Sequence, residues 1–129
     1  MKKIYLIIGI IFLLIFGWIF IRFFIGGSED DWIKDSQGVW IKHGNPSNTP
    51  EQVLEQQEAI SCALGKFNSF TGEINSQCLG VCGDYAVDIV HVLRESEDNK
   101  PENQCEDYSN GIVNHFIELD KDGNIVRIV

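Results

Sequence analysis

An unbroken run of apolar residues opens the chain. Ile4 to Ile21 is 18 residues without a charged side chain, and after Arg22 the run resumes through Ile25. A helix over this length rises about 1.5 Å per residue and crosses a hydrocarbon core of roughly 30 Å. Two lysines precede the run and three acidic residues follow it, which keeps the N-terminus in the cytoplasm. We therefore expect a single-pass transmembrane helix in the cell membrane, a signal-anchor over residues 1–27, with the C-terminal domain outside.

A cleaved signal peptide is the competing interpretation of this run. Signal peptides have shorter apolar regions, of about 7–15 residues, followed by a small-x-small cleavage site. Small residues do follow here, but Phe24 and Ile25 are poor partners for them in such a site. The sequence favours a retained anchor and leaves open whether the anchor is ever cut.

Two short apolar clusters then appear on either side of a polar turn. Trp32-Ile33 and Val39-Trp40-Ile41 flank Asp35 to Gly38, which is the pattern of a β-hairpin. An isolated two-stranded hairpin is marginal in water, so we expect it to pack on the domain or to lie near the membrane surface. Residues 28–48 are thus predicted to form a juxtamembrane Trp hairpin and linker.

An amphipathic helix is predicted from about Pro50 to about Leu64. Thr49 is a suitable N-cap, Gln52 completes a capping box, and Gly65 is a suitable C-terminal cap. Apolar residues recur at helical spacing and form one face: Val53, Ile60, Leu64 and Phe67.

The next apolar segment has two interpretations. Residues 68–83 are rich in Gly, Ser and Asn and are predicted to be a loop. From Asp84 to Arg94 both helical and alternating spacings occur, but the β-branched residues favour a strand with Tyr85 and Val87 on its inner face. Residues 95–111 are polar and acidic, and we expect a long loop that a cysteine ties down.

The C-terminus carries the clearest hairpin signal. His115 to Asp120 and Ile125 to Val129 flank Asp122-Gly123, which favours a type I′ turn. Residues 49–129 are thus predicted to form an α+β domain with one amphipathic helix on a short antiparallel sheet. The turn sets three cross-strand pairs: Leu119 with Val126, Ile117 with Ile128, and Glu118 with Arg127.

Charge and cysteine content limit the partners. Seven Lys and Arg and all 19 acidic residues lie beyond the apolar run, which argues against binding to nucleic acid and against adhesion to anionic lipid.

An even number of cysteines in a small exported domain predicts two disulfides. Three pairings are possible, and the sequence does not choose among the four cysteines: Cys62, Cys78, Cys82 and Cys105.

Two resemblances follow from short motifs. The segment DDWIKDSQGVWIKHGNPS, Asp30 to Ser47, resembles one that follows the anchor in small uncharacterised membrane-anchored proteins of archaea and candidate-phylum bacteria. That resemblance implies an extracytoplasmic domain near the membrane and no reaction. GVCGDYAVDIVHVLRE and NHFIELDKDGNIVRI are similar to the cysteine and histidine motifs of transglutaminase-like cysteine enzymes. By this resemblance Cys82 is the nucleophile and His115 its base.

Other chemistry has weaker support. Cys78 and Cys82, with Cys105, His91 or His115, form a loose zinc pattern, but an oxidising compartment favours disulfides. A run of acids ending at Asp122-Gly123 resembles the start of a calcium loop, yet the hairpin accounts for it. We therefore expect no metal and no cofactor. The favoured function is a binding or structural role at the cell surface, toward an unspecified protein or small molecule, and the alternative is a cysteine hydrolase or transferase.

Overall fold

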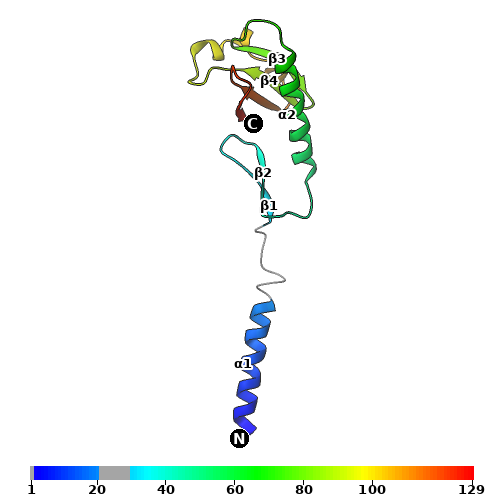
Figure 1. Cartoon of the computed structure of the whole chain (residues 1–129), viewed down its shortest axis with the longest axis vertical. Helices are drawn as coiled ribbons and strands as arrows, with labels where there is room; N and C mark the ends of the chain where they lie inside the picture. The colour runs from blue at the N-terminus through cyan, green and yellow to red at the C-terminus, as the bar shows by residue number, and fades with distance from the viewer. Residues whose placement is uncertain (1, 21–29) are drawn as a thin grey trace.

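The structure is a computed structural model that describes residues 2–20 and 30–129. Residues 30–129 form a small α+β domain that contains two disulfides, as predicted. Figure 1 shows the helix α2 (Glu51–Ser69) beside the strands of this domain. The hairpin of β1 (Asp31–Lys34) and β2 (Trp40–His43) precedes this helix in the chain.

The prediction of a transmembrane helix is wrong. Among the residues that the structure describes, no helix is both long and apolar enough to cross a membrane. The first helix, α1 (Lys2–Phe20), has 19 residues and begins with two lysines. Arg22, Ile25 and the boundary between residues 27 and 28 lie outside the described residues.

Four strands form the central sheet in the order β3-β4-β5-β6. The outer pairs are antiparallel, but β4 and β5 run parallel, so the sheet is mixed and the prediction of an antiparallel sheet is wrong. Parallel neighbours need a crossover connection, because a tight turn reverses the chain direction. The strands are β3 (Gln77–Cys82), β4 (Tyr85–Ile89), β5 (His115–Leu119) and β6 (Ile125–Ile128).

The crossover, residues 90–114, covers one face of the sheet, and α2 covers the other. Alternation along β4 separates the faces, because Val87 packs in the larger core with α2 whereas Ala86 packs in a smaller core with Cys105. The crossover contains three short helical turns, so the predicted long loop is partly ordered: η2 (Ser96–Asn99), η3 (Pro101–Asn103) and α3 (Glu106–Ser109).

The helix α2 (Glu51–Ser69) is longer than predicted. It begins directly after Pro50, with no side-chain cap, so the predicted capping role of Thr49 is wrong. It also continues through Gly65, because Phe67 in the added turn packs against the larger core. That contact outweighs the cost of glycine in a helix, about 1 kcal/mol.

The Trp hairpin is confirmed as β1 (Asp31–Lys34) paired antiparallel with β2 (Trp40–His43). Of the two expected locations, the structure shows packing on the domain. The buried Gln56 side chain of α2 accepts a hydrogen bond from Trp40 N (2.8 Å) and donates one to Gly38 O (2.9 Å). Ile128 N of β6 donates to Gln37 O at 2.7 Å, so the hairpin turn lies against the edge of the sheet.

Two strand predictions need correction. Residues 77–82, predicted as loop, form β3, which contains Gly80 at a φ of +105° and an irregularity in its pairing. In the C-terminal hairpin, the pairs Ile117 with Ile128 and Glu118 with Arg127 are confirmed. Leu119 pairs with Ile125 and not with Val126, because a bulge shifts the register by one residue.

Candidate functional site

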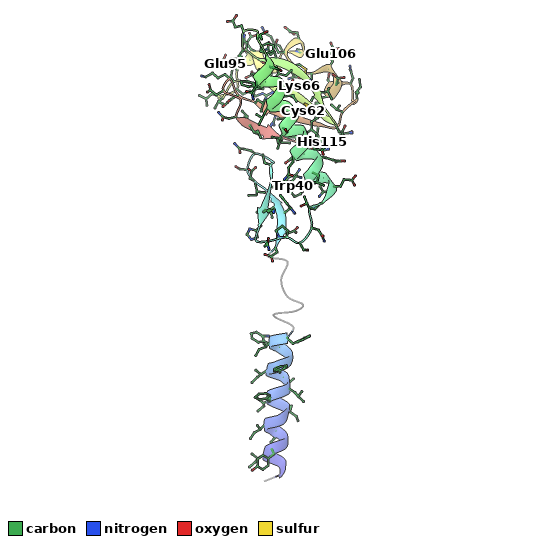
Figure 2. All side chains as sticks on the ribbon, turned by 45° about the vertical axis from the view of Figure 1, so that its right-hand side comes forward. Trp40, Cys62, Lys66, Glu95, Glu106 and His115 are labelled. Atoms are coloured by element: carbon green, nitrogen blue, oxygen red, sulfur yellow. A yellow bond between two sulfur atoms is a disulfide. The ribbon has the colours of Figure 1, made fainter. Side chains whose placement is uncertain are left out.

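Each disulfide joins β3 to an element that covers the sheet, one to α2 on one face and the other to the crossover on the opposite face. Cys62 of α2 bonds to Cys82, with 5.8 Å between their Cα atoms, and Cys78 bonds to Cys105 of the crossover, with 4.9 Å. No cysteine within residues 30–129 is free. Figure 2 shows Cys62 on α2, and its disulfide links this helix to the sheet.

A bulge explains why the two cysteines of β3 point to opposite faces. Residues four apart in a regular strand share a face. Here Cys78 pairs with Asp88 and Cys82 pairs with Tyr85, and the register shifts between Cys78 and Gly80. Asp88 and Tyr85 are three apart on β4 and lie on opposite faces, so their partners do as well.

The residues of the cysteine-enzyme motif do not form a nucleophile and base. Cys82 lies at the end of β3, not at a helix start, and its sulfur is in a disulfide. His115 lies two strands away, because Tyr85 pairs with Cys82 on one side and with His115 on the other. Two strand spacings put the backbones roughly 10 Å apart. The His115 ring stacks on Tyr85, with centroids 4.9 Å apart, and its Nδ1 is 3.1 Å from Val129 O.

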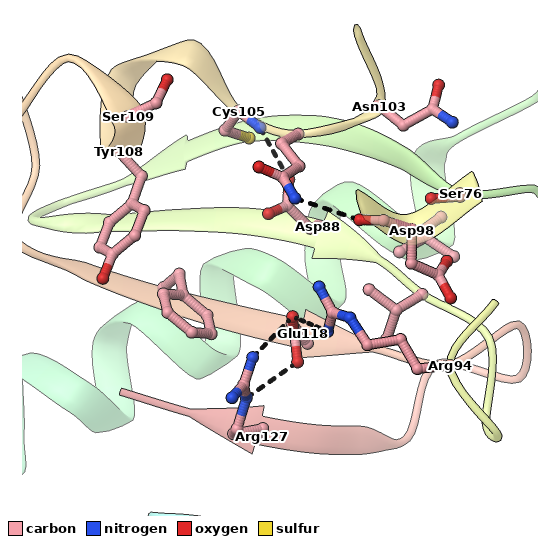
Figure 3. Close-up of a pocket in the computed structure, with 14 residues that line it drawn as sticks. Ser76, Asp88, Arg94, Asp98, Asn103, Cys105, Tyr108, Ser109, Glu118 and Arg127 are labelled. Carbon is pink, nitrogen blue, oxygen red and sulfur yellow. Dashed lines mark hydrogen bonds and ion pairs between the residues drawn. The ribbon is translucent and has the colours of Figure 1, made fainter. Parts of the chain in front are cut away.

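The face under the crossover carries a row of residues that bear chemical groups. Pairing across the four strands aligns Cys78, Asp88, Glu118 and Arg127 as direct neighbours. Residues of the crossover close over this row and leave a cavity of about 200 Å³ (Figure 3). Asp88, Glu118 and Arg127 line it from the sheet, and Arg94 lines it from the crossover.

Glu118 is held between two arginines. Its side chain is almost fully buried, with the residue 5% exposed. Arg94 Nη1 lies 2.8 Å from Glu118 Oε1, and Arg127 donates two hydrogen bonds, from Nε to Oε2 at 3.0 Å and from Nη2 to Oε1 at 3.1 Å. The hydrogen bond to Glu118 raises the pKa of Arg94 above its usual value. Glu118 carries one negative charge against two positive charges, so these three side chains keep a net charge of +1 in the cavity wall.

Asp88 has a different environment from Glu118. Its Oδ1 accepts a hydrogen bond from Cys105 N at 3.1 Å, and among the ion pairs of residues 30–129 none includes Asp88. Burial raises the pKa of the Asp88 carboxyl from 3.8 to about 6, and the Glu118 charge adds to this, while Cys105 N and Arg94 oppose it. Asp88 is thus the acidic group of the cavity that lacks a cationic partner.

Asp98 anchors the crossover and also lines the cavity. The residue is 2% exposed, and its carboxylate accepts hydrogen bonds from His91 N, Glu95 N and the His91 ring. Burial raises the pKa of Asp98, but together these hydrogen bonds lower it by more than burial raises it. The pKa of Asp98 therefore lies below its ordinary value of 3.8. The nearby Ser76 hydroxyl, in a residue 5% exposed, makes no hydrogen bond of standard geometry within the described residues, although its proximity also lowers the Asp98 pKa. His91 lies just beyond the end of β4.

Aromatic rings complete the wall of the cavity. Tyr108 of α3 meets Phe116 of β5 edge to face, with centroids 4.9 Å apart. The Arg127 guanidinium lies 4.9 Å from the Phe116 ring centroid and covers one of its faces. The sequence did not identify a cavity here, because residues 95–111 were predicted to be a polar loop.

The two weaker metal patterns are not assembled in the described residues. Cys78, Cys82 and Cys105 are in disulfides, so their sulfurs are not thiolate ligands. In the acidic run, Asp120 accepts hydrogen bonds from the backbone of Asp122 and from Asn124, which forms the hairpin turn.

Comparisons with protein-family models, with curated proteins and with solved structures find no match. The fold and the cavity therefore define a small disulfide-bonded α+β domain with a covered polar site, and the two sequence resemblances stay predictions.

Proposed function

We propose that this is a binding domain whose ligand carries a small ammonium group, held in the cavity beneath the crossover. The observation that carries the proposal is the Asp88 carboxyl, which lines a cavity of about 200 Å³ without an ion-pair partner among the described residues. A cavity of that volume holds a small organic cation and excludes a folded partner.

The charge balance of the wall favours a cation over an anion. Three carboxylates, Asp88, Asp98 and Glu118, and two guanidinium groups, Arg94 and Arg127, line the cavity, so the wall carries a formal charge of −1 when Asp88 is ionised. Glu118 pairs with both arginines, and Asp98 accepts hydrogen bonds from the backbone of His91 and Glu95. With a pKa of about 6, Asp88 is mostly ionised at neutral pH. A partly buried carboxylate that lacks a partner gains most from an ammonium group that donates hydrogen bonds to it.

Two further features fit an alkyl ammonium ligand. The rings of Tyr108 and Phe116 offer apolar surface for the carbon chain and an electron-rich face for the cation. The Ser76 hydroxyl, buried in the same wall, has hydrogen-bonding capacity that a ligand can use.

The two disulfides support an oxidising compartment as the place where this function operates. Disulfides persist outside the cytoplasm, whereas cytoplasmic thiols are kept reduced. We therefore place the domain outside the cytoplasm as part of the proposal.

The experiment is a titration of the full, unreduced chain with propylammonium chloride, followed by isothermal calorimetry and by NMR shifts of the Cys105 amide. We expect saturable binding, a shift of the Cys105 amide because its proton bonds to Asp88, and at least about tenfold weaker binding by Asp88→Asn. The neutral 1-propanol and the anionic propionate are ligand controls. Glu102→Gln, which removes an acid from the crossover outside the cavity, is the matched variant and is expected to bind normally. Equal binding of all three ligands, or unchanged binding by Asp88→Asn, refutes the proposal.

The alternative, a cysteine enzyme using Cys82 and His115, has no supporting contact in the site. Cys82 supplies a thiolate only after its disulfide to Cys62 is reduced. Alkylation of the unreduced chain followed by mass spectrometry tests this: labelling of Cys82 supports the enzyme, and absence of labelling removes it.

A further inference from the structure

The Cys78–Cys105 disulfide lies beside an ionisable carboxyl group. A carboxylate oxygen of Asp88 and the two sulfur atoms all lie within 4.8 Å of one another. Two backbone features produce this arrangement: Asp88 is the direct neighbour of Cys78 across β3 and β4, and its Oδ1 accepts a hydrogen bond from Cys105 N. The carboxyl group is therefore held at the sulfurs by the sheet and by the crossover together.

The two sulfurs differ in access. Cys78 is exposed, whereas Cys105 is buried, with the residue only 2% exposed. An external thiolate attacks the sulfur that it can reach, and the electron pair of the broken bond leaves on the other sulfur. Access thus assigns Cys78 as the attacked sulfur and Cys105 as the leaving group.

A buried leaving thiolate is costly unless it is protonated. Burial disfavours the charged sulfur, and a leaving thiol departs faster when its negative charge is neutralised. Asp88 is the acid within reach of Cys105, and burial raises its pKa to about 6, so it holds its proton in weakly acidic solution. An ordinary exposed carboxyl group would be almost fully ionised there.

We propose that Cys78–Cys105 is a redox-active disulfide that exchanges electrons with an external dithiol, and that Asp88 gives the proton to the Cys105 sulfur as the bond breaks.

The exchange proceeds in two steps. In the first, one thiolate of the dithiol attacks Cys78 Sγ, the bond to Cys105 breaks, and Cys105 Sγ takes the electron pair and the Asp88 proton. In the second, the other thiol of the reagent loses its proton and attacks its own sulfur in the mixed disulfide, so that Cys78 leaves as a thiolate. The dithiol is oxidised to a disulfide, the protein disulfide gains two electrons, and the released protons restore Asp88 and the Cys78 thiol through water.

The surroundings of Cys78 also suit a thiolate. Gly80 N donates to Cys78 Sγ at 3.2 Å, so a hydrogen-bond donor is already in place for a sulfur anion. This hydrogen bond stabilises Cys78 as the leaving thiolate in the second step.

The second disulfide is an internal control. Cys62 is exposed and Cys82 is 2% exposed, so access to this pair is asymmetric in the same way. Within residues 2–20 and 30–129, a carboxyl oxygen lies within 4.8 Å of both sulfurs at Cys78–Cys105 but not at Cys62–Cys82. Glu55, Glu58 and Asp84 line a hollow around Cys62–Cys82 at greater distance. The two disulfides thus differ in how closely an acid approaches the sulfurs.

The test measures how fast dithiothreitol reduces each disulfide of the full chain from about pH 5 to about pH 8, a range that brackets the proposed proton transfer. Thiols are alkylated at timed intervals, the remaining disulfides are reduced and labelled with a second reagent, and the peptides are quantified by mass spectrometry. Rates are divided by the concentration of dithiothreitol thiolate. We expect Cys78–Cys105 to react about tenfold faster than Cys62–Cys82 at low pH, and this advantage to fall as Asp88 loses its proton.

Variants separate proton donation from a structural role. Asp88→Asn is expected to slow the reduction of Cys78–Cys105 about tenfold at low pH and to flatten its pH profile, and Asp88→Glu to restore part of both. Glu102→Gln, which removes an acid from the crossover outside the cavity, is expected to leave the profile unchanged. The Asp88→Asn variant keeps the other ionisable groups around the cavity, so a flattened pH profile assigns the titration to Asp88. The retained groups are Glu118, Arg94, Arg127, Asp98, His91 and Tyr108.

Two results overturn the proposal. One is equal reduction rates for the two disulfides in the full chain, and the other is an Asp88→Asn profile that matches the unsubstituted chain. Hydrogen exchange of the Cys105 amide shows whether Asp88→Asn changes how often the crossover opens. If Asp88→Asn slows reduction while the amide exchanges equally fast or faster, the slower reduction is due to lost proton donation and not to reduced access. The reactions contain no amine, so their outcome is independent of the ligand proposal.

Discussion

Replacing Asp88 with asparagine is expected to stabilise the protein at neutral and alkaline pH. The pKa of Asp88 is raised from 3.8 to about 6 in the folded state, chiefly by burial. The folded state therefore binds the Asp88 proton more tightly than the unfolded state does, and stability falls as pH rises from about 4 through about 6. Asparagine has no proton to lose, and its Oδ1 still accepts the hydrogen bond from Cys105 N.

The size of the effect follows from the two pKa values. Each unit of difference between the folded and unfolded pKa changes the free energy of unfolding by about 1.4 kcal/mol. The difference between 3.8 and about 6 therefore corresponds to at most about 3 kcal/mol. Asp88 is only half-buried, and solvent in the cavity screens its charge, which reduces this free-energy difference. We expect Asp88→Asn to be more stable by about 1–2 kcal/mol above pH 7 and nearly equal to the unsubstituted chain near about pH 4.

The assay is urea unfolding of the full chain, with both disulfides intact, at intervals of pH from about 4.5 to about 8. The pKa values of Asp84, Asp98 and Asp120 lie below 3.8, so the stability that these groups contribute is lost only below this range. The other ionisable groups are present in both chains, so their contributions cancel in the difference. A stability difference that is independent of pH, or a less stable Asp88→Asn at pH 8, refutes the burial argument.

Three more substitutions test the packing. Changing Cys62 and Cys82 together to serine opens a loop of sequence separation 20 and is expected to lower the free energy of unfolding by about 3 kcal/mol; unchanged urea unfolding contradicts this. Gly38→Ala places a Cβ against Ile128 O at a φ of +86°, so we expect a loss of about 2 kcal/mol and faster amide exchange in β1 and β2, and slow exchange there contradicts the packing. Glu118→Gln removes the charge that holds two arginines, which is expected to cost about 2 kcal/mol and lower Tm in thermal denaturation; an unchanged Tm is the contrary result.

Local signals were sufficient for the hairpins. The turn Asp122-Gly123 and the alternation around it predicted β5 and β6, including the ion pair of Glu118 with Arg127. The Trp hairpin was predicted in the same way, since its strands are close in sequence and joined by a polar turn. The bulge beside Leu119 was missed, because the sequence pattern alone does not show where a register shifts.

Non-local pairing was not predictable from the same signals. The parallel pairing of β4 with β5 joins segments separated by residues 90–114, and no turn motif connects them. Strand β3 was missed because Gly80 and its polar neighbours read as a loop, yet the pairing with β4 stabilises it. The disulfide connectivity depends on the bulge in β3, which reverses the side to which Cys78 points relative to Cys82.

The covered charges give the strongest reason to regard the cavity as functional. A polar row on one face of a small sheet is ordinarily left in water, where its charges need no partners. Here the crossover covers that row, and the burial of Asp88 opposes folding by as much as about 3 kcal/mol above its pKa. The Cys78–Cys105 disulfide, which spans a sequence separation of 27, contributes about 3–4 kcal/mol and offsets this cost. Because asparagine would keep the hydrogen bond to Cys105 N without the cost, stability alone does not account for a carboxyl group at this position. A group that is retained against stability is expected to act through its charge or its proton, and the ligand titration and the reduction kinetics distinguish these two roles.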